Sequence, residues 1–242
     1  MRFKAIVSYD GSQFKGWQIQ DDVRTVQGEI EKALSKISKK DIAITASGRT
    51  DAGVHAENQI FHFDSDLDIP WKKAMNTLLP RDIHIQNVTK VSQDFHARFN
   101  AISKKYGYKI NMREYNVFDR NYILQYNRYI DVQKLKEALN LFLGTHDFTS
   151  FNKTPINIVP NQVRTISDIM IEESNGIITI EIMGDGFLRH MIRMLIATAL
   201  AYSEGKISLD NIKFSLEKPD KNLIQFNVDG CGLYLKEVYY TP

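Results

Sequence analysis

The sequence predicts an α+β fold, in which helices cover an antiparallel sheet, and three observations lead to that prediction. Residues 83–91 and 104–112 both have the pattern of strands, and no amphipathic helix lies between them. Strands that follow one another in this way pair antiparallel, because a parallel pair needs a long crossover that is usually helical. Ser174-Asn175-Gly176 separates two further strand-like runs, which is typical of a hairpin. Elsewhere, apolar residues recur at helical spacing and add helices to the sheet.

The first hundred residues have the pattern of four strands and two helices. We expect strands over residues 3–9, 42–45, 58–63 and 83–91. Thr25 is a suitable N-cap for a helix whose apolar stripe runs from Val26 to Ile37. A shorter helix opens at Pro70 and is expected to turn its apolar side chains inward: Trp71, Ala74, Met75 and Leu78. Residues 95–101 are expected to be extended and to lead into the next strand.

The remaining residues repeat this theme, so each half should hold about two helices and four strands. Further strands are expected over residues 104–112, 163–172, 177–182 and 233–239. Asp131 should cap a helix that ends at Gly144, and residues 145–151 should form a loop. Phe187 to Tyr202 has the pattern of an apolar helix, and Ser208 should cap a last short one.

The composition is that of a globular chain without membrane segments. A length of 242 residues is enough for one large domain or two of ordinary size. Of these residues, 43% are apolar and 25% are charged, which is ordinary for a globular protein. No apolar run of about 18 residues occurs, and residues 1–7 become polar too soon for a signal peptide. A single cysteine, Cys231, excludes an internal disulfide and a multi-thiolate zinc site. We therefore expect a cytoplasmic protein with no membrane partner.

Residues 47–55, Ser-Gly-Arg-Thr-Asp-Ala-Gly-Val-His, form a candidate catalytic loop between two strand-like runs. Its two glycines indicate a tight turn, and loops held by a rigid scaffold often carry chemistry. Arg49 and Asp51 are one residue apart, so the guanidinium could pair with the carboxylate and keep it ionised. Such an Asp can act as nucleophile, general base or metal ligand. The alternative is a structural loop in which Asp51 caps a nearby amide such as that of Val54, with Arg49 solvated.

A basic stretch covers residues 96–113, although the net charge of the whole chain is only +2. It contains no acidic residue and five basic ones: Arg98, Lys104, Lys105, Lys109 and Arg113. Phe99, Tyr106 and Tyr108 lie among them. Cations can bind a phosphate backbone and aromatic rings can stack on bases, so this stretch is a candidate RNA-binding segment. The alternative is a strand with a solvated lysine face.

Gly48-Arg49-Thr50-Asp51-Ala52-Gly53-Val54-His55-Ala56 resembles the signature loop of the tRNA pseudouridine synthase A family. Four further motifs agree with that family and occur in its order along the chain. They are Tyr9-Asp10-Gly11 with Gly16-Trp17-Gln18, then Phe95-His96-Ala97-Arg98-Phe99, Lys105-Tyr106-Gly107-Tyr108, and His146-Asp147-Phe148-Thr149-Ser150-Phe151. Nine consecutive matching residues and four further motifs in the same order make the resemblance specific.

The resemblance implies two ferredoxin-like α+β halves, residues 1–100 and 101–242. Their antiparallel sheets would join into one central sheet, with the active-site cleft between the halves. Asp51 would be the essential carboxylate and Arg49 its partner. Tyr106 matches the family's active-site tyrosine and would stack on the uracil, whereas Tyr108 is expected to be structural. Phe187 would line the uracil pocket and Arg193 would bind phosphate or the carboxylate, although core packing and a snorkelling side chain remain the alternatives for these two.

The resemblance also implies the substrate and the assembly. Family members isomerise uridine to pseudouridine at positions 38, 39 and 40 of the tRNA anticodon stem-loop and work as homodimers. The sequence contains no phosphate-binding glycine loop and no dinucleotide motif, so no cofactor is expected. In the present chain, Arg98, Lys104 and Lys105 would contact the RNA backbone. Residues 152–161 and 194–231 depart from the family's usual pattern, which bears on the choice of uridines rather than on the chemistry.

Two other classes of function compete with this one. A protein of the same fold could bind or chaperone RNA without catalysis, although binding an anion gives no reason to keep a carboxylate in the loop. A metal-dependent hydrolase could use Asp51 with His55 or His62, but the spacing of these residues matches no helical pair or zinc motif. We therefore expect no metal.

Overall fold

The computed structural model describes residues 1–241, which form two compact units. The first unit contains residues 1–104 together with the described residues from Tyr234 onward, and the second contains residues 105–233. The division falls a few residues after the expected boundary near residue 100. It also differs from the expectation in placing the last strand with the first unit, because that strand pairs there.

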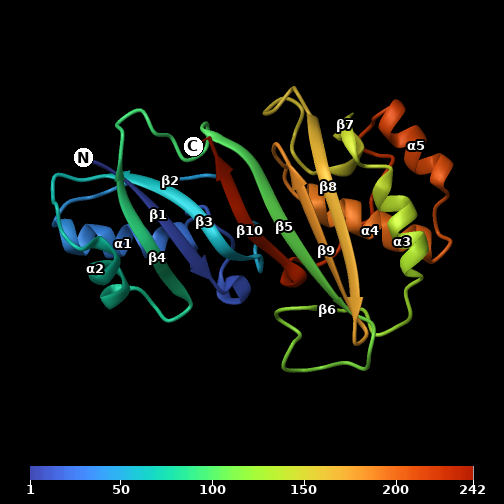
Figure 1. The fold of residues 1–242 in the computed structure, drawn as a ribbon, viewed down its shortest axis with the longest axis horizontal. Helices are drawn as coiled ribbons and strands as arrows, with labels where there is room; N and C mark the ends of the chain where they lie inside the picture. Colours follow the sequence, from blue (N-terminus) through green and yellow to red (C-terminus); the bar gives the residue numbers. More distant parts are fainter. Residues whose placement is uncertain (242) are drawn as a thin grey trace. The chain divides into compact units, whose positions relative to one another are not determined.

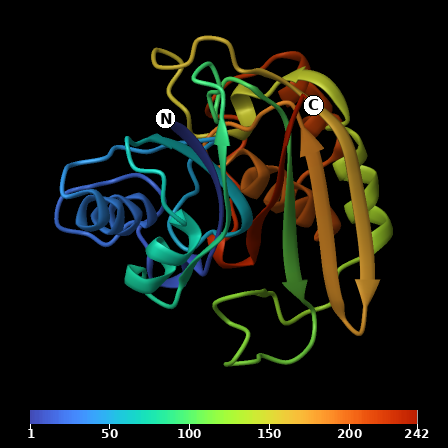
Figure 2. The same cartoon turned by 60° about the vertical axis from the view of Figure 1, so that its left-hand side comes forward.

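The first unit is a sheet with strand order β4-β1-β3-β10, and α1 and α2 lie side by side on one of its faces (Figures 1 and 2). Its elements are β1 (Arg2–Tyr9), η1 (Gly11–Gln13), α1 (Val26–Ser38), β2 (Thr45–Ala46), β3 (His55–Asp64), α2 (Trp71–Leu78), β4 (Ile83–Val91) and β10 (Leu233–Tyr240). β1 pairs antiparallel with β3 and β4, whereas β10 pairs parallel with β3 through Tyr234 opposite His55. β2 adds a short antiparallel pairing to the far end of β3.

Alternation and capping explain the elements of the first unit. Every second residue of β1 is buried, from Phe3 to Tyr9, so the strand presents one face to the core. Thr25 caps α1 as expected, because its hydroxyl accepts the amide of Gly28. Ile30 and Leu34 of α1 are fully buried, as the helical spacing predicts.

The second unit is a sheet with strand order β5-β9-β8-β7, and α3 and α4 pack against each other beside it (Figure 1). Its elements are β5 (Ala101–Asn111), β6 (Leu124–Gln125), α3 (Val132–Asn140), β7 (Gly144–Asp147), η2 (Thr149–Phe151), β8 (Val163–Ser174), β9 (Ile177–Gly184), α4 (Met191–Ser203), α5 (Leu209–Glu217) and η3 (Gly230–Gly232). Asn175 and Gly176 both have positive φ, which makes the predicted hairpin between β8 and β9. The α+β class is therefore confirmed, with antiparallel pairing dominant in both sheets.

Several predicted elements differ from the structure. The strand expected over residues 42–45 is reduced to β2, and the segment 95–100 is a series of turns rather than extended chain. The loop expected over residues 145–151 holds β7 and η2, and α4 begins only at Met191 because His190 adopts a left-handed conformation. Leu78 of α2 is 44% exposed, although the pattern placed it inward.

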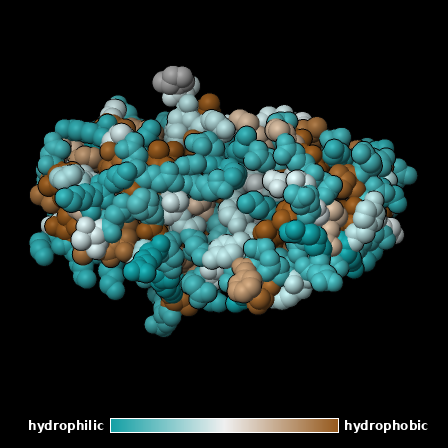
Figure 3. Space-filling view, turned by 60° about the horizontal axis from the view of Figure 1, so that its bottom comes forward, coloured by the Kyte–Doolittle hydropathy of each residue, from teal (hydrophilic) through white to brown (hydrophobic). Residues whose placement is uncertain are grey.

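Figure 3 shows a face on which hydrophilic residues predominate and hydrophobic ones form separate patches. Within residues 1–241, no helix is both long enough and apolar enough to cross a membrane.

Candidate active site

The candidate catalytic loop connects β2 to β3 in the first unit and presents Asp51 at its bend. Asp51 is half-buried, Arg49 is exposed and Thr50 between them is buried. The amide of Val54 donates to the backbone carbonyl of Asp51 at 3.2 Å, which closes the bend. His55, which the sequence placed in the loop, is instead the first residue of β3.

The segment that follows β1 fixes one side of this loop. The Trp17 amide donates to the Thr50 carbonyl at 3.0 Å, and the Tyr9 hydroxyl shares a buried hydrogen bond of 2.8 Å with Thr50 Oγ1. The Gly53 amide donates to the carbonyl of Phe14 at 3.4 Å. Burial raises the pKa of the Tyr9 phenol, so Tyr9 stays protonated at neutral pH. The two N-terminal motifs of the sequence therefore hold the residues on either side of Asp51.

Glycine is required where this segment touches the loop. Gly16 has φ +99°, and a Cβ there would lie 2.8 Å from the Thr50 carbonyl oxygen and 3.3 Å from the Asp51 carbonyl carbon. A Cβ on Gly11 would lie 2.0 Å from the Val54 carbonyl oxygen. Neither position has room for a side chain, so the backbones meet directly. This close approach explains why both motifs contain glycine.

Three polar side chains fix the other side of the loop. Ser47 Oγ donates to Gln59 Oε1 at 2.6 Å, and Gln59 Nε2 donates to the Gly48 carbonyl at 2.9 Å. Lys104 Nζ donates to the Ser47 carbonyl at 2.7 Å. Ser47 and Gln59 are fully buried. Lys104 thus supports the loop in this structure, a contact that the sequence did not suggest because Ser47 is 57 residues away.

His55 is packed into the base of the loop. Its Nδ1 accepts the Gly11 amide at 3.0 Å, and its ring stacks on Tyr234 of β10 with centroids 4.7 Å apart. Asp10 Oδ1 lies 3.3 Å from the same nitrogen. The imidazole is 2% exposed, so it acts here as a structural residue. The part of the chain that the structure describes contains no group of three or more His, Cys, Asp or Glu side chains placed to hold a metal ion.

The ion pair expected between Arg49 and Asp51 is not present among residues 1–241. Arg49 points to solvent, with no hydrogen bond or ion pair there, while Asp51 has other interactions. The catalytic role of Arg49 as the partner of the carboxylate stays a prediction.

The second unit holds the other predicted site residues. Tyr106 on β5 is 8% exposed, and its ring meets that of Phe187 edge-on with centroids 5.3 Å apart. Phe187 lies in the segment between β9 and α4, not on the helix as predicted. Arg193 lies in the first turn of α4 and is half-buried, and its Nε donates to the Val228 carbonyl at 2.7 Å. These three residues come from three segments of one unit.

Tyr108, expected to be structural, is fully buried in the second unit. Its hydroxyl donates to the Asp229 carbonyl at 2.7 Å, next to the carbonyl that Arg193 holds. Burial raises the pKa of Tyr108 well above its usual value, so the phenol remains a donor. Residues 228 and 229 are therefore fixed by two side chains from β5 and α4.

The predicted RNA-contacting residues have different environments. Arg98 is exposed and its guanidinium lies 5.9 Å from the ring centre of Phe99. Lys105 forms an ion pair of 3.3 Å with Glu181 of β9. Glu181 offsets the charge of Lys105, whereas Lys104 keeps its charge but is bound to the Ser47 carbonyl of the loop. Of the three, Arg98 is the one that the structure leaves most open to a phosphate.

The fold is α+β, and the candidate catalytic loop places the Asp51 carboxylate between residues that other segments of the first unit hold in position. A family model for tRNA pseudouridine synthase matches residues 5–100 and 138–241. Curated relatives named tRNA pseudouridine synthase A include one from Geobacillus sp. (strain WCH70), 43% identical over 99% of this chain and 98% of that protein. Another is from Bacillus subtilis (strain 168), 42% identical over 99% of each chain. The chain belongs to the tRNA pseudouridine synthase family and is an isomerase, which confirms the resemblance found in the sequence.

A solved structure, a Cbf5-Nop10-Gar1 complex, is a much weaker match. It has a TM-score of 0.39 and 11% identity over 96% of this chain and 57% of that chain, which is too low to support any conclusion.

Proposed function

We propose that this chain converts uridine to pseudouridine in tRNA, with Asp51 as the essential carboxylate. Family membership over nearly the full length supports the reaction and the tRNA substrate. The observation that supports Asp51 is the loop itself. Hydrogen bonds and close backbone contacts fix the residues on either side of it, and Asp51 keeps part of its surface accessible. A catalytic group has to be held in its reactive position before the reaction begins.

The reaction breaks the bond between ribose C1′ and uracil N1 and forms one between C1′ and C5. The C5 proton is lost and N1 gains a proton, so the product is an isomer of the substrate. An ionised Asp51 can attack C1′, add to C6 of the ring, or help remove the C2′ proton to give a glycal. Each route places the carboxylate near the glycosidic bond.

The target base has to leave the helical stack before a carboxylate can reach it, which costs a few kcal/mol. In this proposal Tyr106 stacks on the uracil, Phe187 lines the pocket beside it, and Arg193 binds phosphate or the carboxylate. The edge-on contact between Tyr106 and Phe187 supports the first two assignments, because it fixes the plane of the tyrosine ring. Arg49 is proposed to pair with the Asp51 carboxylate when the substrate is bound, since its side chain is exposed and only one residue separates the two in the sequence.

We further propose the family's targets for this chain, which are uridines 38, 39 and 40 of the anticodon stem-loop. The chain would act as a homodimer in the cytoplasm and without a cofactor. Arg98, Lys104 and Lys105 would follow the RNA backbone, with Arg98 the best placed by its exposure.

The test is tritium release from tRNA transcripts labelled at uridine C5, with the wild type and Asp51→Asn side by side. Asn keeps the shape of Asp but removes the charge, so release should fall below detection while tRNA affinity stays within about tenfold. Near-normal release by the variant would remove Asp51 from the mechanism. Tight tRNA binding without release by the wild type would favour an RNA-binding protein. Loss of release on chelation would favour a metal-dependent enzyme.

A further inference from the structure

The chain between β4 and β5 exposes an aromatic ring next to a cation. Residues 95–99, here called the 95–99 turn, follow β4 in the first unit. Phe99 is 76% exposed, and Arg98 beside it is also exposed. A single exposed apolar residue is ordinary on a protein surface. The 95–99 turn that carries Phe99, however, is held in place by several side-chain contacts.

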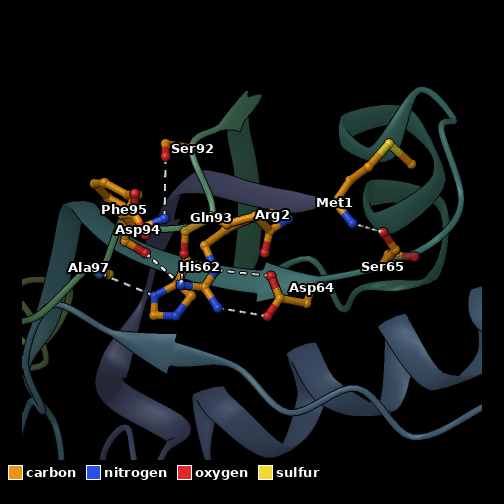
Figure 4. A network of polar contacts seen from close by, with 10 residues as sticks. All are labelled: Met1, Arg2, His62, Asp64, Ser65, Ser92, Gln93, Asp94, Phe95 and Ala97. Atoms are coloured by element: carbon orange, nitrogen blue, oxygen red, sulfur yellow. Dashed lines mark hydrogen bonds and ion pairs between the residues drawn. The ribbon is translucent and has the colours of Figure 1, made fainter.

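Arg2 and His62 fix the turn from the sheet side (Figure 4). Arg2 binds both carboxylate oxygens of Asp64, at 2.9 and 2.8 Å, and donates to the carbonyls of Gln93 and Phe95 at 2.6 and 3.0 Å. His62 Nδ1 accepts the Ala97 amide at 3.1 Å. Burial, and then the charge of Arg2, lower the pKa of His62 to about 4, so the imidazole is neutral and able to accept at neutral pH.

The last strand of the first unit adds a further contact. The Tyr240 hydroxyl donates to the Ala97 carbonyl at 2.7 Å, and the Tyr240 ring lies 5.3 Å from that of Phe95. Both backbone polar groups of Ala97 are thus bound to side chains, one from β3 and one from β10. Ala97 is fully buried. The position of the turn is therefore determined by three strands of the sheet.

His96 then orients the exposed ring. Its Nδ1 accepts the amides of both Arg98 and Phe99, each at 3.2 Å, so the imidazole caps the turn. The Phe99 ring stacks on the imidazole with centroids 4.2 Å apart and planes inclined by 26°. One face of Phe99 is covered in this way, while most of the side chain stays in solvent. The guanidinium of Arg98 lies 5.9 Å from the ring centre.

We propose that His96 and Phe99 form a stacking platform on which an unpaired base of the tRNA substrate stacks, with Arg98 bound to an adjacent phosphate. This inference rests on the proposed function, because it takes tRNA as the ligand. A flat ring with an accessible face and a cation next to it matches the two chemical parts of a nucleotide. The fixed backbone means that little conformational entropy is lost when the base binds.

The experiment measures tRNA affinity, and kcat and KM for tritium release, in Phe99 variants of the full chain. Stacking on one aromatic side chain is worth about 1–3 kcal/mol, or about 5- to 150-fold in affinity. Phe99→Ala should raise Kd and KM by that factor and leave kcat within about twofold. Phe99→Trp should restore wild-type affinity, whereas Phe99→Leu, which is apolar without a π face, should not. Arg98→Gln should lower the slope of log affinity against log salt by about 1.

Phe118→Ala is the matched control, because Phe118 is 84% exposed and makes no ring contact in residues 1–241. Its affinity should equal that of the wild type. Unchanged affinity of Phe99→Ala, with normal release by the wild type, would overturn the platform and leave the proposed function intact. Equal affinity of the Leu and Trp variants would also overturn it, since stacking would not be involved. Loss of tRNA affinity in Phe99→Ala, with rescue by Trp, would support the platform even if the wild type released no tritium.

Discussion

Gly16→Ala tests whether the segment after β1 positions the catalytic loop. Gly16 touches no substrate in our proposal, and only its backbone meets the loop. The substitution adds one methyl group whose carbon would lie 2.8 Å from the Thr50 carbonyl oxygen. It also places an alanine at φ +99°, which L residues rarely adopt.

Two costs add up in this variant. The backbone conformation alone costs a non-glycine residue about 1–3 kcal/mol. The methyl group requires residues 50–52 to retreat by about 0.5 Å, because a carbon atom packs at about 3.3 Å or more from a carbonyl oxygen. We expect the free energy of unfolding to fall by about 2–4 kcal/mol in total. Since a displacement of 1 Å costs about 100-fold in rate, a shift of half that size should lower kcat by about 10-fold.

Gly205→Ala is the matched control for the backbone cost. Gly205 has φ +73°, and a Cβ there would meet nothing within 4 Å. This variant should lose about 1 kcal/mol of stability and keep its kcat. Both variants would be measured by urea unfolding and by tritium release at saturating tRNA, at a temperature where both are folded. If Gly16→Ala kept wild-type kcat, or if both variants lost activity equally, the segment would not position Asp51.

Two further predictions concern contacts of the first unit. Lys104→Met keeps the side-chain stem but removes the ammonium that holds the Ser47 carbonyl, so kcat should fall about 10-fold. Because Lys104 is also proposed to follow the RNA backbone, the slope of log tRNA affinity against log salt should fall by about 1, and an unchanged slope would remove it from the RNA-binding residues. His62 should make the free energy of unfolding depend on pH. Its pKa of about 4 in the folded protein lies below the ordinary value of 6.5, so the unfolded chain binds the proton more readily at pH values between these two. Its contribution is complete above pH 6.5 and is lost as pH falls toward 4, by up to about 3 kcal/mol since each pKa unit corresponds to about 1.4 kcal/mol. His62→Gln should make the unfolding midpoint less dependent on pH over this range.

Local rules predicted much of the fold. Thr25 and Asp131 cap helices because their side chains reach amides two or three residues away, which spacing alone can show. The turn at Asn175 and Gly176 follows from the backbone conformations that these two residues tolerate. The signature loop could also be located, since its glycines and its flanking strands lie within a short stretch.

The features that the sequence did not predict depend on distant partners. The 95–99 turn was expected to be extended, but its amides and carbonyls bind Arg2, His62 and Tyr240, which are far away along the chain. Residues 42–44 do not extend β2, and the Ile44 amide binds Glu31 of α1 instead. Among residues 1–241 the expected pair of Arg49 with Asp51 is absent, and the Arg49 side chain is exposed.

The parallel pairing of β10 with β3 has a consequence for how the protein is made. The ribosome synthesises the chain from the N-terminus to the C-terminus, so most of the first unit emerges long before β10 is made. Until then one edge of β3 lacks the partner that Tyr234 and Leu235 provide, and His55 lacks the ring that covers it. A chain cut short by a late stop codon would keep every residue of the catalytic loop but not this support. The catalytic loop therefore gains its full support only after translation of the chain is complete.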